Sequence, residues 1–445
     1  MLNRLFKLSE NGTNVSREIQ AGLTTFAAMA YILAVNPAIL ANTGMDQAAL
    51  VTVTALTAAV STILMAALTN FPLALAPGMG INAFFTYSIC IGAGVRWQDA
   101  LGMVFVNGCI FLLLSVTGVR EKIVKAIPYA LKIAITCGIG LFIAFIGLKN
   151  GGVIVDNPAT LVSHGDFTSG SVIVCLIGIA LTIVLVARGI PGAIILGIAI
   201  TTIVGLFVSN GDGGKVTSWP SAILAMPASP APVFLELEFG FLKSSTAFLA
   251  ALPLILTLLM VDMFDNIGTL IGVTKRAGML DKEGHLPKAG RALIADSIAA
   301  ILSSLFGTST VVSYIESASG VEAGGRTGLT GVTVAILMLL ALLLSPLILA
   351  VPAAATAPAL VIVGIFMLQS VVEIKMDEFQ IAAPAMLTII CIPLTFSIAE
   401  GIGIGLIAAA LLALTSGKAK SFPTTGYVIA GFFFLEFFHI FPFSG

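Results

Sequence analysis

The sequence predicts an all-α protein that crosses a membrane many times. Of its 445 residues, 58% are hydrophobic and only 10% are charged, whereas a soluble domain carries roughly 25% charged residues. Apolar runs of about 20 residues, long enough for a helix to cross a bilayer, recur along the whole chain. A spanning segment in lipid must satisfy its own backbone polar groups, so these runs are expected to be helices. A formal net charge of −1 gives no basic surface for nucleic acid.

The apolar runs divide into fourteen predicted spans, preceded by a short polar arm at residues 1–20. The arm lacks the long apolar stretch of a secretory signal, so we expect it to remain in the cytoplasm. The spans are expected at residues 21–41, 50–69, 72–91, 97–117, 129–149, 170–187, 190–209, 246–273, 291–306, 307–325, 328–350, 354–372, 380–397 and 400–416.

The distribution of basic residues predicts the orientation. With the N-terminus in the cytoplasm, 17 of the 21 Lys and Arg residues fall in inner segments. The outer segments hold only Arg96, Lys149, Lys215 and Lys243. This asymmetry matches the positive-inside rule. The Phe-rich tail, residues 417–445, either lies in the membrane interface, which we favour, or forms an extra span.

The chain divides into two halves of opposite orientation. Seven predicted spans precede the long loop 210–245, which we place outside the membrane, and seven follow it. Because seven is odd, the second half enters the membrane from the side opposite to the first. This arithmetic predicts a 7+7 inverted repeat, an arrangement that many transporters share.

The third span of each half is interrupted. The third span reads FPLALAPGMGINAFFTYS, and the tenth reads GTSTVVSYIESASGVEAGG. Proline and glycine in the first, and β-branched and small residues in the second, disfavour a continuous helix. Each is expected to be a short extended piece running into a half-helix. Broken spans at matching positions of two halves indicate a transporter's substrate site, although neighbouring helices also tolerate simple kinks.

Polar residues occur at similar depths in three spans. Asn82 and Glu316 lie at the midpoints of the third and tenth spans, and Asp262 is less than one turn from the midpoint of the eighth. Asp265 follows Asp262 at i+3, on the same face of the predicted helix. We interpret the two aspartates as a polar stripe that faces the interior of the bundle.

Carboxylates at this depth are costly, at about 2.5–3.5 kcal/mol each on insertion scales. No Lys or Arg is predicted at mid-depth, so protonation is the natural way to remove the cost. Asp262, Asp265 and Glu316 are therefore candidates for proton exchange. The alternative is that one Asp caps a broken helix end. Asp296 lies nearer the inner end and is interpreted as a structural or interfacial group.

The half-helices predict a binding array for a flat polar ring. Their N-termini, near residues 80 and 317, would present partial positive charge and free N–H groups. Phe84, Phe85 and Phe264 are close enough in sequence to stack on a ring, although core packing is the commoner role for any single Phe. The three histidines lie in loops or the tail, and the five cysteines are scattered. We therefore expect no metal and no cofactor.

Five segments resemble a known family. TTFAAMAYILAVNP (24–37), ALAPGMGINAFF (74–85), DMFDNIGTLIGV (262–273), GTSTVVSYIESASGVEAGGRTGLT (307–330) and PLTFSIAEGIGIG (393–405) are similar to the AzgA-like branch of the nucleobase-cation symporter-2 family. The resemblance covers nearly the whole chain. It implies proton-driven uptake of adenine, guanine or hypoxanthine across the plasma (inner) membrane by a homodimer, and no enzymatic activity. It also implies a core domain, spans 1–4 (21–117) and 8–11 (246–350), and a gate domain, spans 5–7 (118–209) and 12–14 (351–416).

The resemblance also assigns residues. The family's third-span Asn falls on Asn82, its tenth-span Glu on Glu316, and its eighth-span acidic position on Asp265. Either Asp262 or Asp265 could carry the coupling proton, and the wider family often has Glu at the position of Asp265. The expected substrate contacts are Asn82, Phe84, Phe264, Asp265, Glu316 and Ser317.

Two other functions are compatible with parts of the pattern. An inorganic-anion transporter of the same fold would need positive potential at the site, and the acidic residues argue against it. An intramembrane aspartyl protease uses two Asp residues, but it places them on different helices, one of them in a GxGD motif that this chain lacks. The ranking of the three purines, and proton rather than sodium coupling, stay open at this stage.

Overall fold

The computed structural model describes residues 2–117, 128–211, 213–279, 288–417, 419 and 422–437. Several side chains of helix α11 lie outside this description, among them those of Phe264 and Asp265. The described chain is mainly helical, and its strands form only two short antiparallel pairs.

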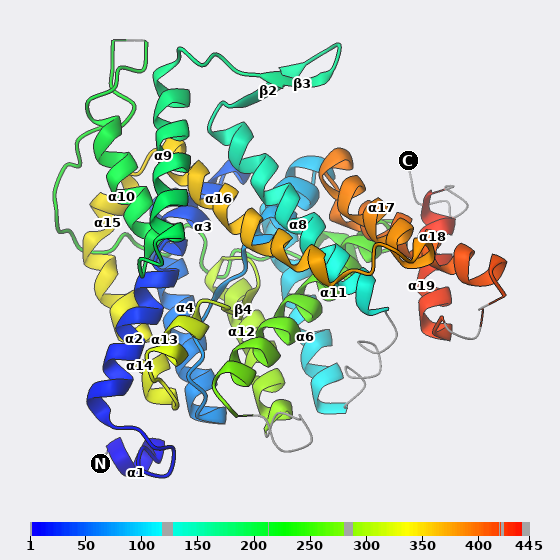
Figure 1. Ribbon diagram of the computed structural model, residues 1–445, viewed down its shortest axis with the longest axis horizontal. Helices are drawn as coiled ribbons and strands as arrows, with labels where there is room; N and C mark the ends of the chain where they lie inside the picture. Colours follow the sequence, from blue (N-terminus) through cyan, green and yellow to red (C-terminus); the bar gives the residue numbers. More distant parts are fainter. Residues whose placement is uncertain are drawn as a thin grey trace.

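Each predicted span contains at least one helix, which confirms the polytopic helical fold (Figure 1). By length and composition, ten helical segments of the described residues could cross a membrane, and four shorter apolar helices accompany them. The first half comprises α1 (Leu2–Phe6), α2 (Val15–Met29), α3 (Ile32–Leu40), η1 (Ala41–Thr43), α4 (Gln47–Thr69), β1 (Leu75–Pro77), α5 (Met79–Ala83), η2 (Phe84–Gly92), α6 (Trp97–Thr117), α8 (Tyr129–Asn150), β2 (Ile154–Asn157), β3 (Leu161–His164), α9 (Gly170–Ala187) and α10 (Ala193–Gly205). The second half comprises η3 (Gly240–Leu242), α11 (Ser245–Arg276), α12 (Ala289–Phe306), β4 (Val311–Ser313), α13 (Ser317–Glu322), α14 (Gly328–Ala341), η4 (Leu342–Leu344), α15 (Ser345–Leu349), α16 (Ala353–Leu368), η5 (Gln369–Glu373), α17 (Phe379–Thr395), α18 (Ile398–Thr415) and α19 (Thr424–Phe437).

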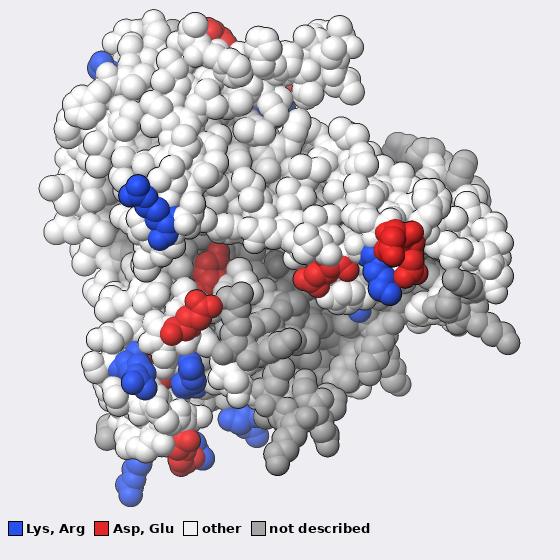
Figure 2. All heavy atoms as spheres, viewed as in Figure 1, with Lys and Arg blue, Asp and Glu red and all other residues white. Residues whose placement is uncertain are grey.

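The surface agrees with a membrane environment. Figure 2 shows a face on which charged side chains are sparse and most of the described surface carries none. Large apolar side chains are exposed on the outward faces of the helices, for example Leu113 on α6, Ile183 on α9 and Leu411 on α18. Exposed apolar surface on this scale is expected where lipid replaces water as the solvent.

The two broken spans pair with each other. Strands β1 and β4 are antiparallel, with Leu75 opposite Ser313 and Pro77 opposite Val311. Pro77 is tolerated because the strand has only one neighbour. Gly78 follows it where a Cβ atom would lie 2.9 Å from a methyl carbon of Val312, so only glycine fits without a shift. Each strand then leads into a half-helix, as the sequence predicts.

The first span is also interrupted, which the sequence analysis did not predict. Helix α2 ends at Met29 and α3 begins at Ile32, with Ala30 and Tyr31 between them. The amide of Leu33 donates to the carbonyl of Ala30 at 3.1 Å, and the amide of Ala34 donates to the carbonyl of Tyr31 at 3.1 Å. These i to i+3 bonds tighten the turn and place Tyr31 at a bend inside the protein.

The helices pack in two groups (Figure 1). In the lower half of the view, α4 packs on α12 and α14, α6 on α12, and α2 on α13 and α14. In the upper and right-hand parts, α8 packs on α16 and α17, α9 on α10 and α16, and α17 on α18. The broken spans lie where helices of the first group meet α8 and α11.

The C-terminal tail contains helix α19, which packs on α18. The ring of Phe433 lies against Gly403, where a Cβ atom would approach it to 2.7 Å. The described part of this helix has 14 residues. The choice between an interfacial tail and an extra span involves residues 438–445, which lie outside the described residues, and stays a prediction.

The buried carboxylate of Glu18 joins α2 to the start of α14. Its Oε1 accepts a hydrogen bond from the amide of Arg326 at 2.9 Å. Its Oε2 accepts one from the Thr330 hydroxyl at 2.6 Å and others from the amides of Thr327 and Thr330, both at 3.2 Å. Acceptors of this kind satisfy the free N–H groups at a helix start and complement its dipole.

Replacing Glu18 by Ala is expected to lower the melting temperature of the detergent-solubilised protein. Hydrogen bonds to a charged group contribute about 1.5–3 kcal/mol each, and this substitution leaves buried donors without an acceptor. The control is Glu10→Ala, which removes an exposed carboxylate 3.2 Å from Lys7 and is expected to change little. Equal melting temperatures for the two variants would contradict the capping role.

Candidate substrate site at the broken spans

Glu316 lies immediately before α13 and contacts the bend of the first span. The hydroxyl of Tyr31 donates to Oε1 of Glu316 at 2.6 Å. Tyr31 is only 1% exposed, whereas Glu316 is half-buried. A phenol donor at this distance fixes the position of Oε1. Because the carboxylate is planar, the orientation of its other oxygen is then restricted as well.

Ser317 joins the start of α13 to the approach of β1. The amide of Ala74 donates to Oγ of Ser317 at 3.0 Å, and the hydroxyl of Tyr314 donates to the carbonyl of Pro77 at 2.6 Å. Ser317 is fully buried. Its hydroxyl therefore joins the two broken spans directly, beside Glu316.

Asn82 lies at the other end of the strand pair. The amide of Gly78 donates to the carbonyl of Thr310, and the amide of Tyr314 donates to the carbonyl of Ala74, so the two half-helices start at opposite ends. The hydroxyl of Ser309 donates to Oδ1 of Asn82. Its Nδ2 is buried and has no acceptor among the described residues. The structure thus does not join Asn82 and Glu316 directly.

The structure describes the side chain of Phe84 but not that of Phe264, the other predicted aromatic contact. Phe84 begins the π-helical segment η2 and is fully buried in the main hydrophobic core. Packing in the core is thus its visible role. The backbone of Phe264 and Asp265 belongs to α11, but both side chains lie outside the described residues, so their predicted roles stay predictions.

Asp262 belongs to a buried network of carboxylates and amides. Its Oδ2 accepts from Nδ2 of Asn107 on α6 at 3.1 Å, and its Oδ1 accepts from Nδ2 of Asn266 at 3.0 Å. The same nitrogen of Asn266 also donates to Asp296 on α12. All four side chains are at most 2% exposed. Asp296, interpreted from the sequence as a structural or interfacial group, is a buried partner in this network.

Asn266 also connects this network to the broken tenth span. Its Oδ1 accepts from the backbone amide of Ser313, at the end of β4, at 2.9 Å. Because one carboxamide donates to two carboxylates and accepts from the strand, its orientation is fixed on both sides. A change at Asp262 or Asp296 would therefore be felt at β4, three residues before Glu316.

Sequence reasoning missed Tyr31, Asn107 and Ser309. Tyr31 and Asn107 are the midpoints of the predicted spans 21–41 and 97–117. The depth comparison that singled out Glu316 would have found both. Ser309 lies near a span end and carries no comparable signal, because only the pairing of β1 with β4 brings it to Asn82.

Taken together, the fold and the site define a class of protein. Each half of the chain contributes one span that contains a strand, the two strands pair, and polar side chains are buried around the pair. This is the architecture of a secondary transporter. The transmembrane domain of the cyanobacterial bicarbonate transporter BicA has the same fold, with a TM-score of 0.66, 16% sequence identity, and coverage of 89% of this chain and 97% of that chain.

Within this class, the chain belongs to the permease family whose model, Xan_ur_permease, matches residues 16–404. It is 45% identical to the putative permease MJ0326 of Methanocaldococcus jannaschii, over 99% of this chain and 98% of the relative. It is 42% identical to the guanine/hypoxanthine permease PbuG of Bacillus subtilis, over 98% and 99%, and 40% identical to the adenine permease AdeP of Escherichia coli, over 98% and 96%. The protein is therefore a multi-pass membrane transporter and not a protease.

Proposed function

We propose that the protein takes up purine nucleobases, namely adenine, guanine or hypoxanthine, in symport with protons. Two relatives that align over nearly their full length are named as permeases for these bases. The observation that carries the proposal is the carboxylate of Glu316, held by Tyr31 at the junction of three interrupted spans. A purine presents N–H groups along one edge, and a fixed carboxylate is a strong acceptor for them.

Asn82 supports the same assignment. Its Nδ2 is a buried donor without an acceptor among the described residues, and such a group is costly unless a partner arrives. The ring nitrogens of a purine are acceptors. In our proposal a movement of the broken spans brings Asn82 to the base that Glu316 holds, with Ser317, Asp265, Phe264 and Phe84 as the further predicted contacts.

Transport in this proposal is a movement of the core domain against the gate domain. The core comprises residues 21–117 and 246–350, and the gate comprises 118–209 and 351–416. The packing of α4, α6, α12 and α14 on one another, and of α8, α9, α16 and α17 on one another, supports this division. The proposal includes a cytoplasmic N-terminus and a homodimer in the plasma membrane.

Proton coupling is assigned to Asp262, Asp265 and Glu316. One of the two aspartates takes a proton from outside, the base binds at Glu316, and both leave on the inner side after the core has moved. The burial of Asp262 supports this role, because a carboxylate inside a membrane protein is usually part of an ion or proton pathway.

The experiment is uptake of labelled adenine by cells that express the protein. We expect saturable uptake, inhibited by unlabelled guanine or hypoxanthine but not by uracil, and lost when a protonophore collapses the proton gradient. Uptake that continues in the presence of the protonophore but requires sodium would show that sodium, and not the proton, is the coupling ion. No uptake of any purine would overturn the proposal.

An inorganic-anion transporter is the second candidate, because BicA shares the fold. An anion site needs positive potential, whereas Glu316, Asp262 and Asp296 carry acidic groups into the region. Uptake of labelled bicarbonate or sulfate by the same cells distinguishes the two. We expect none above the level of cells that lack the protein.

Replacing Tyr31 by Phe is expected to raise the KM for adenine about tenfold, with little change in the maximal rate. The ring that packs in the core is kept, and only the hydroxyl that orients Glu316 is lost. A hydrogen bond to a charged group contributes about 1.5–3 kcal/mol, and 1.4 kcal/mol corresponds to a factor of ten in affinity. Initial rates over a range of adenine concentrations measure the effect.

The matched control is Tyr427→Phe. The hydroxyl of Tyr427 donates to the carbonyl of Ala419 at 3.1 Å, near the start of α19 and outside the broken spans. We expect its KM to be unchanged. An unchanged KM in Tyr31→Phe would show that Tyr31 does not position Glu316 for binding.

A further inference from the structure

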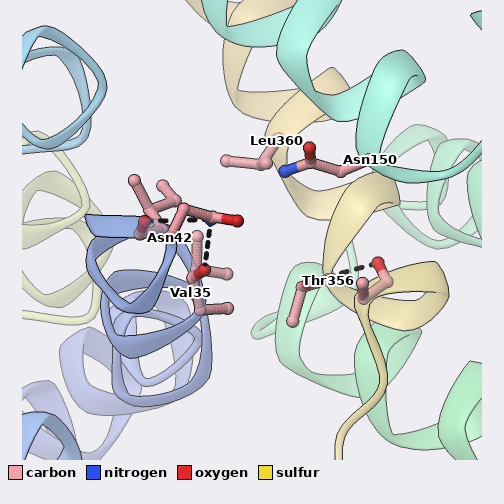
Figure 3. A pocket seen from close by; sticks show the side chains of 8 residues that line it. Val35, Asn42, Asn150, Thr356 and Leu360 are labelled. Atoms are coloured by element: carbon pink, nitrogen blue, oxygen red, sulfur yellow. Dashed lines mark hydrogen bonds between the residues drawn. The ribbon is translucent and has the colours of Figure 1, made fainter. Parts of the chain in front are cut away.

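A small pocket lies between the outer part of the first span and the gate helices (Figure 3). It measures about 130 Å³ and is lined by Val35, Ala38, Ile39, Asn42, Asn150, Ala353, Thr356 and Leu360. These residues come from α3 and η1 on one side, and from α8 and α16 on the other. With a cytoplasmic N-terminus, all of these segments meet at their outer ends.

The lining has a regular pattern on both sides. Residues 35, 38, 39 and 42 follow the i, i+3, i+4, i+7 spacing of one helix face, and residues 353, 356 and 360 follow the same rule on α16. Val35, Ile39 and Leu360 are at most 2% exposed, whereas Asn42 and Asn150 are exposed. The pocket therefore has an apolar floor and a polar rim.

The two carboxamides on the rim are oriented. Nδ2 of Asn42 donates to the carbonyls of Ala38 at 2.9 Å and Ile39 at 3.0 Å. These two bonds orient the carboxamide, and Figure 3 shows its Oδ1 pointing into the pocket. Asn150 lies across the gap and donates to the hydroxyl of Tyr87 at 3.2 Å, which leaves its second N–H for another acceptor.

The floor of the pocket leads toward Glu316. Val35 lies one helical turn beyond Tyr31, about 6 Å along the axis at 1.5 Å per residue. The hydroxyl of Tyr31 binds Glu316. The floor residues on α3 therefore lie between the pocket and the turn that carries Tyr31, with Val35 nearest to Tyr31 and Ile39 one turn further out.

We propose that this pocket is a second, outer site, where the nucleobase binds before it reaches Glu316. The inference rests on the proposed function. The edge of a nucleobase carries a donor and an acceptor side by side, which match the acceptor of Asn42 and the donor of Asn150. Its apolar faces match Val35, Ile39 and Leu360. The pocket is well below the roughly 300–1,000 Å³ of sites for drug-sized ligands, so it suits a compact ring and excludes a nucleoside.

The test is protection of a cysteine by adenine. Ala353→Cys places a thiol in the lining without removing either Asn, and a membrane-impermeant thiol reagent added outside labels it. The assay uses Glu316→Gln as background, so that occupancy of the deeper site cannot cause the protection. The control is Ala159→Cys in the exposed β2–β3 turn, and protein without a new cysteine gives the labelling of the five native ones.

We expect adenine to slow labelling of Ala353→Cys at least fivefold and to leave Ala159→Cys unchanged. Adding Asn42→Ala is expected to raise the half-protecting concentration about tenfold, and adenosine is expected not to protect. Absence of protection in the Glu316→Gln background, or protection unaffected by Asn42→Ala, would overturn the outer site. If either result is found while the unmodified protein takes up adenine, the outer site is wrong but the proposed function is not affected.

Discussion

Replacing Glu316 by Gln is expected to reduce adenine uptake at least 100-fold without removing the protein from the membrane. Oε1 of a Gln still accepts the hydrogen bond from Tyr31, which here measures 2.6 Å, so the shape of the site is kept. What changes is the charge and the ability to bind a proton. The amide NH₂ group would also face the N–H edge of the base, where donor meets donor.

The expected size follows from the interactions lost. Hydrogen bonds to a charged group contribute about 1.5–3 kcal/mol each, and two of them correspond to at least a 100-fold change at 1.4 kcal/mol per factor of ten. The measurement is the initial rate of labelled adenine uptake, divided by the amount of protein in the membrane fraction.

The control for this variant is Glu322→Gln. Glu322 ends the same half-helix, α13, and is exposed. Its neutralisation is expected to change uptake less than twofold. Normal uptake by Glu316→Gln with an unaltered pH dependence would remove Glu316 from both the binding and the coupling roles.

Replacing Asn266 by Leu is expected to destabilise the protein by roughly 3 kcal/mol or more and to abolish uptake. The side chain donates to Asp262 and Asp296 and accepts from the amide of Ser313. Leucine has a similar volume but makes none of these bonds. Each buried polar group left without its partner costs about 1–3 kcal/mol, and the loss also frees β4 from α11.

Thermal unfolding of the detergent-solubilised protein measures the stability, and adenine uptake measures the function. The control is Asn210→Leu, because Asn210 is exposed and its Oδ1 accepts from the hydroxyl of Ser171 at 2.7 Å. We expect a lower melting temperature for Asn266→Leu and an unchanged one for Asn210→Leu. Equal melting temperatures would mean that the Asn266 bridge is not required for the fold.

Most of the fold could be predicted from the sequence because the relevant signals are local. A helix that crosses lipid must satisfy its own backbone, so each span is encoded by its own apolar run. The breaks in the third and tenth spans are equally local, since Pro77, Gly78 and the residues around Glu316 disfavour helix where they stand. Residues 26–36 around Tyr31 contain no proline or glycine, and so the interruption there was missed.

The residues of the candidate site differ in the same way, since some could be found from the sequence and others could not. Asn82, Asp262 and Glu316 could be found by their depth, which is a property of position along a span. Their partners could not: Asn107 is 155 residues from Asp262, Asp296 is 30 residues from Asn266, and Tyr31 is 285 residues from Glu316. Contacts of this kind depend on how helices rotate and cross.

The sequence by itself therefore determined the class of membrane protein, its spans, the two breaks and the family, through apolar length, proline and glycine placement, and motifs. Only the tertiary structure decided which side chains meet. It paired β1 with β4, joined Tyr31 to Glu316, bound Asp262 and Asp296 to one amide, and set Asn42 opposite Asn150. The physical reason is that a helix forms from bonds between near neighbours, whereas a site forms from the packing of helices that are distant in sequence.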